Sequence, residues 1–292
     1  MSPFKPTIEF VYIAKKRHIT LFEQLLALLD KSMSTPTWGG WFHLLCIAAV
    51  VALCVVVVKK ARNLSDRQLN MILGITAGTL LVLEIYKQFN FSYNYTEDSW
   101  GYQWYAFPFQ FCSTPMYVML AAAIVKNERV KTSLYAFLAT YALFAGSAVM
   151  VYPNDVFIET IGINIQTMIH HGTMVVVGVL MYASGRAPLS HKNILRALPT
   201  FGVLVGIALT ANLLYGAVGD PEQTFNMFFI SPYYRCTLPI LSAIYGKIPY
   251  LAFLSCYVFG FSAAGYIMSL GAMGIQKLHG KVKLKTHAKK RA

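Results

Sequence analysis

The residues of this 292-residue chain that could act in catalysis stand inside long apolar stretches, where polar side chains are rare. Cys112 lies in one such stretch, and the adjacent His170 and His171 lie in another. A cysteine becomes a nucleophile when a nearby imidazole or cation favours its thiolate. Glu84 and Lys87, three residues apart in a further stretch, share a helix face and can form an ion pair. These residue types are those that covalent catalysis by a thiol requires.

Each of these residues also has a purely structural interpretation. A lone cysteine in an apolar helix is more often a small filler than a nucleophile, and a histidine often only hydrogen-bonds to a neighbouring helix. Adjacent helical positions point about 100° apart, so at most one of His170 and His171 is aimed at a given atom. Two adjacent histidines and one cysteine lack the spacing of a helical metal site, and the sequence predicts neither a metal nor a cofactor.

The overall composition is that of a membrane protein. Hydrophobic residues make up 56% of the chain and charged residues only 13%, whereas a soluble domain carries about 25% charged residues. This excludes disorder, a coiled coil and an ordinary cytosolic enzyme. The net charge of +13 would suggest nucleic acid as a partner of a soluble protein. Because the basic residues lie between apolar stretches and in the tail, they favour a membrane surface instead, and no nucleic acid is expected.

Seven stretches approach the length of about 20 apolar residues that a membrane-spanning helix needs. We therefore predict an all-α, polytopic helix bundle with about seven transmembrane helices. A segment 1–37, with an apolar run too short to cross, is expected to form an amphipathic helix at the interface. The transmembrane domain would cover 38–271 and a basic tail 272–292. The predicted spans are 38–58, 71–91, 106–125, 134–152, 161–183, 198–216 and 248–271.

Basic residues alternate between the connections of these spans. Lysines and arginines crowd the first, third and fifth connections and the tail, whereas the second and fourth connections hold only acidic charges. The positive-inside rule places the C-terminus in the cytoplasm, and seven spans then place the N-terminus outside.

With this topology, the polar residues within the spans fall in the outer half of the membrane. Ionisable groups at such depth usually face a cavity or a partner, so we predict one outward-opening polar pocket. Pro115 has no N–H, so the carbonyl of Phe111 beside Cys112 is expected to lack its helical partner. The residues expected around the pocket are His43, Glu84, Lys87, Gln88, Asn90, Gln110, Cys112, Asn164, Gln166, Thr167, His170, His171, Thr210 and Asn212.

Several short motifs around these residues resemble one family. Pro108-Phe109-Gln110-Phe111-Cys112 resembles the opening of a span in the YwaF-like integral membrane proteins, whose animal branch is the transmembrane protein 164 group. The other motifs, in the same order, are Ile169-His170-His171-Gly172, Asn226-Met227-Phe228 followed by Pro232, and Gly246-Lys247-Ile248-Pro249-Tyr250. Two positions depart from the family pattern: Gln110 replaces a histidine and Ile248 a tryptophan.

The resemblance implies transfer of a fatty acyl chain from a phospholipid to a lysophospholipid, and these lipids would be the partners. Carried over by position, Cys112 would form an acyl thioester. His171, beside the matching Gly172, would be the general base in preference to His170. The candidates for substrate binding or for an oxyanion hole are Gln110, Glu84, Lys87, Asn212 and Asn226.

Other functions remain open from the sequence. Water in place of the acceptor lipid would make the protein a lipid hydrolase. An outward pocket also suits a transporter or receptor for a small polar ligand, and the loss of the family histidine at Gln110 suits a scaffold with a vestigial pocket. We expect a multi-pass protein of the plasma membrane in a bacterium. In a eukaryote, Lys289 and Lys290 near the C-terminus suggest the endoplasmic reticulum.

Overall fold

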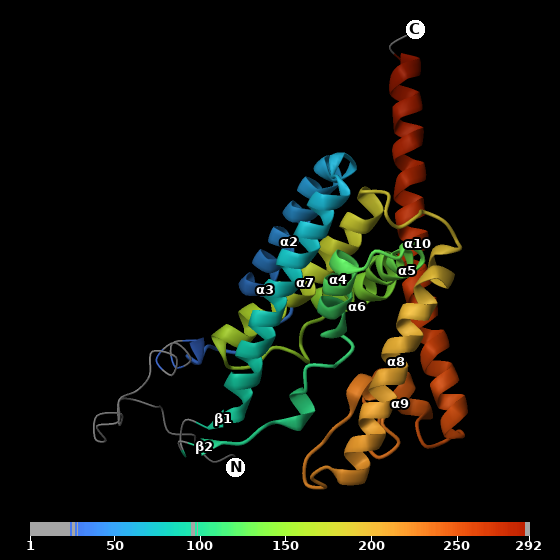
Figure 1. Cartoon of the computed structure of the whole chain (residues 1–292). Coiled ribbons are helices and arrows are strands. Elements are labelled where there is room, and N and C mark those ends of the chain that lie inside the picture. Colours follow the sequence, from blue (N-terminus) through green and yellow to red (C-terminus); the bar gives the residue numbers. More distant parts are fainter. Residues whose placement is uncertain (1–23, 25–26, 28, 95–96, 98, 290–292) are drawn as a thin grey trace.

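The protein is a bundle of long helices, seen in a computed structural model that describes residues 24, 27, 29–94, 97 and 99–289, with side chains up to 277 (Figure 1). Two very short strands, β1 (Tyr93–Asn94) and β2 (Ser99–Trp100), pair antiparallel in the connection after the second long helix. The helices are α2 (Trp41–Lys60), α3 (Asp66–Ser92), α4 (Thr114–Ile124), α5 (Glu128–Phe137), α6 (Leu143–Val151), α7 (Ile161–Ala183), α8 (Asn193–Val218), α9 (Leu241–Ile244) and α10 (Tyr250–Lys289).

Six helical segments of the described chain are long and apolar enough to cross a membrane. They correspond to six of the predicted spans, with α5 and α6 joined into one by a π-helical turn at Leu138–Ala142. The prediction of an all-α membrane bundle is therefore confirmed. The polar residues just before two helices explain where they begin: Ser65 forms a capping box with Gln68 ahead of α3, and the Asn127 side chain caps α5.

The third predicted span differs from the expectation. Only α4, 11 residues long, is helical within 106–125, and its length of about 16 Å is roughly half of the hydrocarbon thickness. Pro115 lies in the first turn of α4, where its missing N–H costs no bond. The proline therefore lies at the beginning of the helix, and the residues before it are irregular.

The helices lie in layers of different burial. In the span made by α5 and α6, 72% of the most apolar window is buried within the protein, whereas the figure for α2 is 6%. Phe137 and Tyr141 on this central span are fully buried and stack on one another. The central span packs against α7, α7 packs against α2, and α8 packs against α5. The central span and α7 thus form the core, and α2 presents its apolar surface outward.

A glycine allows the closest approach between the two core helices. A Cβ atom on Gly146 of α6 would lie 2.7 Å from the carbonyl oxygen of His171 and 2.7 Å from the Cβ of Met174, both on α7. Backbone atoms cannot move aside as the end of a side chain can, so only glycine fits here. Gly146 therefore sets the spacing between α6 and the histidine pair of α7.

Gly146→Ala is expected to lower the free energy of unfolding by about 1–3 kcal/mol, because the added methyl group overpacks the α6–α7 contact. Gly206→Ala is the matched control, since a Cβ on Gly206 of α8 would have no neighbour within 4 Å. Thermal unfolding of both variants in the same detergent measures the difference. Equal midpoints for the two variants would show that the α6–α7 contact yields easily.

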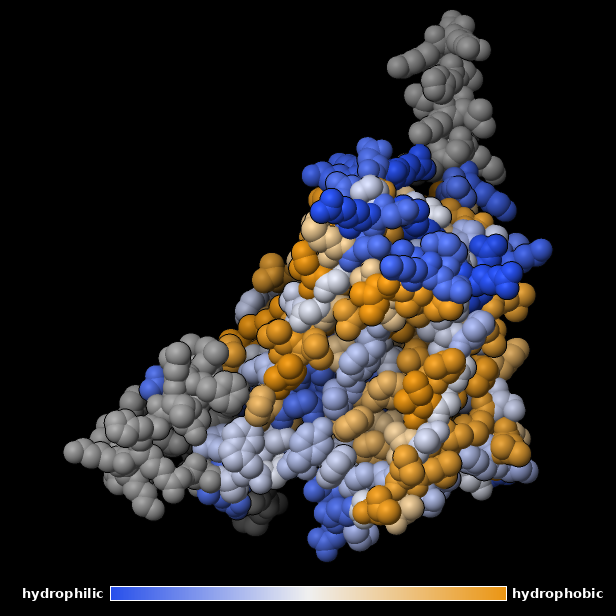
Figure 2. Space-filling view, viewed as in Figure 1, coloured by the Kyte–Doolittle hydropathy of each residue, from blue (hydrophilic) through white to orange (hydrophobic). Residues whose placement is uncertain are grey.

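The basic connections gather at the end of the bundle from which α10 extends, and the surface at this end is strongly hydrophilic (Figures 1 and 2). An ion pair of 2.5 Å between Arg186 and Asp66 joins the α7–α8 and α2–α3 connections there. At the opposite end, His43 Nε2–H donates to the carbonyl of Met150, and Ser32 pairs with Thr160. The predicted amphipathic helix within 1–37 lies almost entirely outside the described residues.

Candidate functional site

The residues just before α4 form an irregular segment inside the bundle. The Thr114 and Ser113 N–H groups donate to the Gln110 carbonyl, but the carbonyls of Pro108 and Phe111 accept from side chains. The Thr114 hydroxyl donates to the carbonyl of Phe111 at 2.9 Å, and the Tyr117 hydroxyl donates to that of Pro108 at 2.9 Å. Non-helical backbone at membrane depth is tolerated only where protein or a cavity surrounds it. The segment therefore needs specific partners, and Cys112 lies within it.

His170 of α7 is the partner of Cys112. Its Nε2–H donates to the Cys112 carbonyl at 2.9 Å, and the His170 side chain is 3% exposed. A neutral imidazole protonated at Nε2 carries its lone pair on Nδ1. The His170 Nδ1 atom is buried and has no hydrogen-bond partner. The structure thus holds an unpartnered proton acceptor beside the Cys112 segment.

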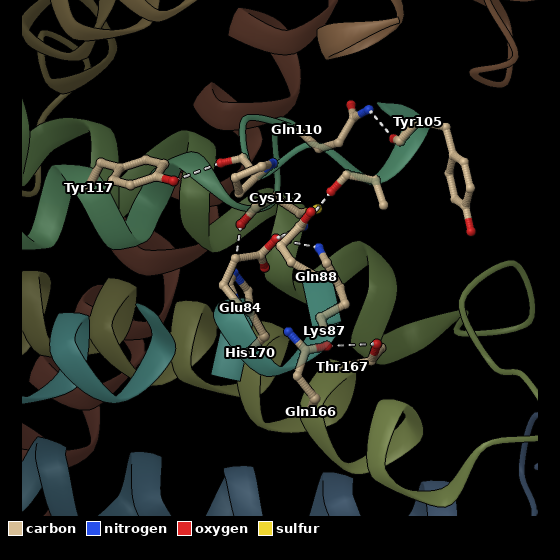
Figure 3. A network of polar contacts seen from close by, with 12 residues as sticks. Glu84, Lys87, Gln88, Tyr105, Gln110, Cys112, Tyr117, Gln166, Thr167 and His170 are labelled. Atoms are coloured by element: carbon tan, nitrogen blue, oxygen red, sulfur yellow. Dashed lines mark hydrogen bonds and ion pairs between the residues drawn. The ribbon is translucent and has the colours of Figure 1, made fainter. Parts of the chain in front are cut away.

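A buried ion pair on α3 lies at the same place (Figure 3). Lys87 Nζ lies 2.6 Å from Glu84 Oε1, as their spacing predicts, and Gln88 Nε2–H donates to the same carboxylate oxygen at 3.1 Å. Gln88 also donates to the Ala106 carbonyl at 2.6 Å, which ties α3 to the chain leading into the irregular segment. The second carboxylate oxygen of Glu84 is buried without a hydrogen-bond partner.

The charges of Lys87 and Glu84 both reach the thiol of Cys112, with opposite effects on it. The charge of Lys87 also reaches both histidines of α7. Cys46 and Cys54 on α2 interact with no charged side chain. Cys112 therefore differs from these cysteines, which fit the role of small apolar fillers.

Tyr102, which lies outside the predicted spans, also joins the site. Its hydroxyl donates to Gln88 Oε1 at 2.9 Å. Burial raises the pKa of the Tyr102 phenol, and the Glu84 carboxylate raises this pKa further, so the phenol remains a donor at neutral pH. A search for polar residues within apolar spans cannot find Tyr102, because it precedes the span.

Gln110 lies at the edge of this site, against the loop before α10. Its Nε2–H donates weakly to the carbonyls of Tyr105 and Asn226, at 3.3 and 3.4 Å, and its Oε1 is buried without a hydrogen-bond partner. Asn212 bonds to the N–H and the carbonyl of Met227, while Asn226 accepts from the Ser231 N–H and donates to the Arg235 carbonyl. The two asparagines thus shape the loop, and their amides are engaged with backbone groups.

The remaining polar residues do not form the single pocket that the sequence predicts. His43 binds the end of α6, Asn164 caps the backbone of Ile158, and the Nδ1–H of His171 donates to the Thr167 carbonyl at 2.8 Å. A polar pocket of about 630 Å³ does lie at the end of α3, but neither Cys112 nor the histidine pair lines it. Side chains that the sequence predicts at one depth in the membrane are separated because they project from their helices in different directions.

The fold and the site define a multi-pass helical membrane protein with a half-buried thiol, a buried imidazole and a partly buried ion pair at one place in the bundle. A model of the TMEM164 family matches residues 32–270, which is most of the chain, so the protein belongs to the TMEM164 family. The comparisons with curated proteins and with solved structures find no match.

Proposed function

We propose that this protein is a membrane-embedded lipid acyltransferase in which Cys112 carries the acyl chain as a thioester. The observation that supports it most is the meeting of three elements at the irregular segment. His170 binds the Cys112 main chain, and the Glu84–Lys87 pair acts on the thiol. The resemblance in the Cys112 motif implies the same chemistry.

The proposed reaction has two symmetrical halves. The thiol of Cys112 gives its proton to an imidazole, and the thiolate attacks the ester carbonyl carbon of a donor phospholipid. The carbon–oxygen bond breaks, the imidazolium returns the proton to the leaving oxygen, and a lysophospholipid departs. An acceptor lysophospholipid then gives its hydroxyl proton to the imidazole and attacks the thioester. The carbon–sulfur bond breaks, and the thiol is restored.

We assign the base to His170. Its ring lies against the Cys112 segment, and its unprotonated nitrogen has no other partner. The motif resemblance favours His171, but that ring is bound through Nδ1–H to Thr167 of its own helix, whereas His170 binds the Cys112 main chain. The Lys87 ammonium is the cation best placed to stabilise the thiolate and the oxyanion, because it interacts with the thiol and with both imidazoles.

His170→Gln is expected to reduce kcat by about 10²–10⁴-fold, the usual contribution of a general base. Glutamine can still donate to the Cys112 carbonyl, so the fold should persist. His171→Gln is the matched variant and should reduce kcat much less. Single-turnover acyl transfer measures both, with thermal unfolding as the control for folding. The reverse order of the two effects would assign the base to His171.

Product analysis separates acyl transfer from the alternatives. Purified protein in vesicles of acyl-labelled phosphatidylcholine is given lysophospholipid or none. We expect labelled phospholipid to form from the added lysophospholipid and little free fatty acid to appear in its absence. Label released as fatty acid in both samples would indicate a hydrolase. Absence of any acyl product, with ligand uptake that survives Cys112→Ala and His171→Ala, would indicate a transporter and exclude the enzyme.

A further inference from the structure

An apolar groove of about 510 Å³ runs along the surface of the bundle beside α2, and the candidate site does not open into it. Its walls are α2 and α3, and its floor is α7. The groove exists because α2 packs on α7 and not on α3. Gly172 of α7 lets α2 come close, since a Cβ there would lie 2.6 Å from Val50 Cγ2. Neither Cys112 nor His170 lines this groove.

The groove has an apolar lining that suits a hydrocarbon chain, and one end of the groove carries a charged side chain. Leu53 and Val56 of α2 line it and are 54% and 48% exposed. Lys60, at the end of α2, is the only charged residue among the described residues that line it. A lysine at a helix end reaches along apolar surface to place its ammonium at the interface.

The position of Lys60 matches the headgroup of a lipid. From Phe42 to Lys60 the groove follows 19 residues of α2, about 27 Å, which is nearly the hydrocarbon thickness of a bilayer. Lys60 is the last residue of α2, and the connection that follows α2 lies at the end of the bundle from which α10 extends (Figure 1). The positive-inside rule assigns this end to the cytoplasmic leaflet, where anionic lipids are found.

We propose that the half of this groove next to Lys60 binds an anionic phospholipid, with its phosphate on Lys60 and an acyl chain between α2 and α3. Charge complementarity selects this occupant: an anionic headgroup pairs with the one charged residue, and acyl chains match the remaining apolar lining. The lipid fills the gap between α2 and α3, which do not pack on each other. The site is separate from the proposed thioester chemistry and does not depend on it.

Native mass spectrometry of the detergent-purified full chain tests the proposal with two probes, phosphatidylglycerol and phosphatidylcholine of identical acyl chains. The wild type is expected to retain phosphatidylglycerol more tightly. Lys60→Gln should weaken this retention about fivefold, the value of one lysine near an anionic surface. Lys59→Gln is the matched control, because Lys59 is exposed beside it but does not line the groove.

A second pair of variants tests the acyl chain. Thr76→Phe fills the groove from α3 and should abolish retention of both lipids, whereas Thr79→Phe, one turn away and outside the lining, should leave it unchanged. Equal effects of Lys59→Gln and Lys60→Gln would overturn the proposal, because they would show general surface attraction. Unchanged retention in Thr76→Phe, or a dimer that Thr76→Phe dissociates, would also overturn it. The dimer would place a second copy of the chain in the groove.

Discussion

Cys112→Ala is expected to abolish acyl transfer, with a loss of at least about 10³-fold, because no other group in the proposed site can carry the acyl chain. Incubation of the wild type with acyl-labelled phospholipid should leave label on the protein that neutral hydroxylamine removes, as it does from thioesters. A peptide digest should place this label on Cys112. The variant should carry no such label.

Cys46→Ala and Cys54→Ala are the matched controls for this experiment. Both cysteines lie on α2, and neither interacts with a charged side chain. Both variants should keep the activity and the label of the wild type. Transfer that persists in Cys112→Ala would contradict the thioester mechanism, and so would turnover by the wild type without any hydroxylamine-sensitive label.

Lys87→Met is expected to lower the free energy of unfolding by about 3 kcal/mol, the low end of the range for breaking a buried ion pair. The variant leaves the Glu84 carboxylate, only 2% exposed, without its cation. The low end applies because the Lys87 side chain is itself 16% exposed and water screens part of the interaction. Thermal or denaturant unfolding in detergent measures the loss.

The double variant Glu84→Gln/Lys87→Met distinguishes the stability contributed by the ion pair itself from the cost of leaving one buried charge unpaired. It removes both charges and keeps a side chain that can accept from Gln88, so it should regain much of the lost stability. Activity should stay low in both variants, because the cation beside the Cys112 thiol is gone. Equal stability of the wild type and Lys87→Met would show that water already solvates this carboxylate.

Much of the fold follows from local properties of the sequence. The predicted span 161–183 has the same bounds as α7, Ile161–Ala183, because hydropathy over about 20 residues is enough to mark a membrane helix. The Glu84–Lys87 ion pair follows in the same way from a spacing of three residues on one helix. The resemblance to the family also follows from the sequence, and the family model, which matches residues 32–270, confirms the membership.

The third predicted span shows where local reasoning fails. Pro108 and Pro115 mark a disturbance, but the same prolines fit a kinked helix or a late helix start. The outcome depends on Tyr117, Thr114 and His170, whose side chains satisfy the carbonyls of the irregular segment. Two of these donors are close in sequence, but the third comes from α7.

The choice between the adjacent histidines is the clearest case of a feature that depends on tertiary contacts. The sequence predicts that both histidines lie at one depth and project about 100° apart. It does not show which of the two faces Cys112. α7 packs closely on α6 at Gly146, and in this packing His170 binds the Cys112 carbonyl while His171 is bound to Thr167. Hydropathy and spacing are properties of one segment. The distance between side chains on different helices depends on how those helices pack, so the composition of the candidate site is decided only in the folded bundle.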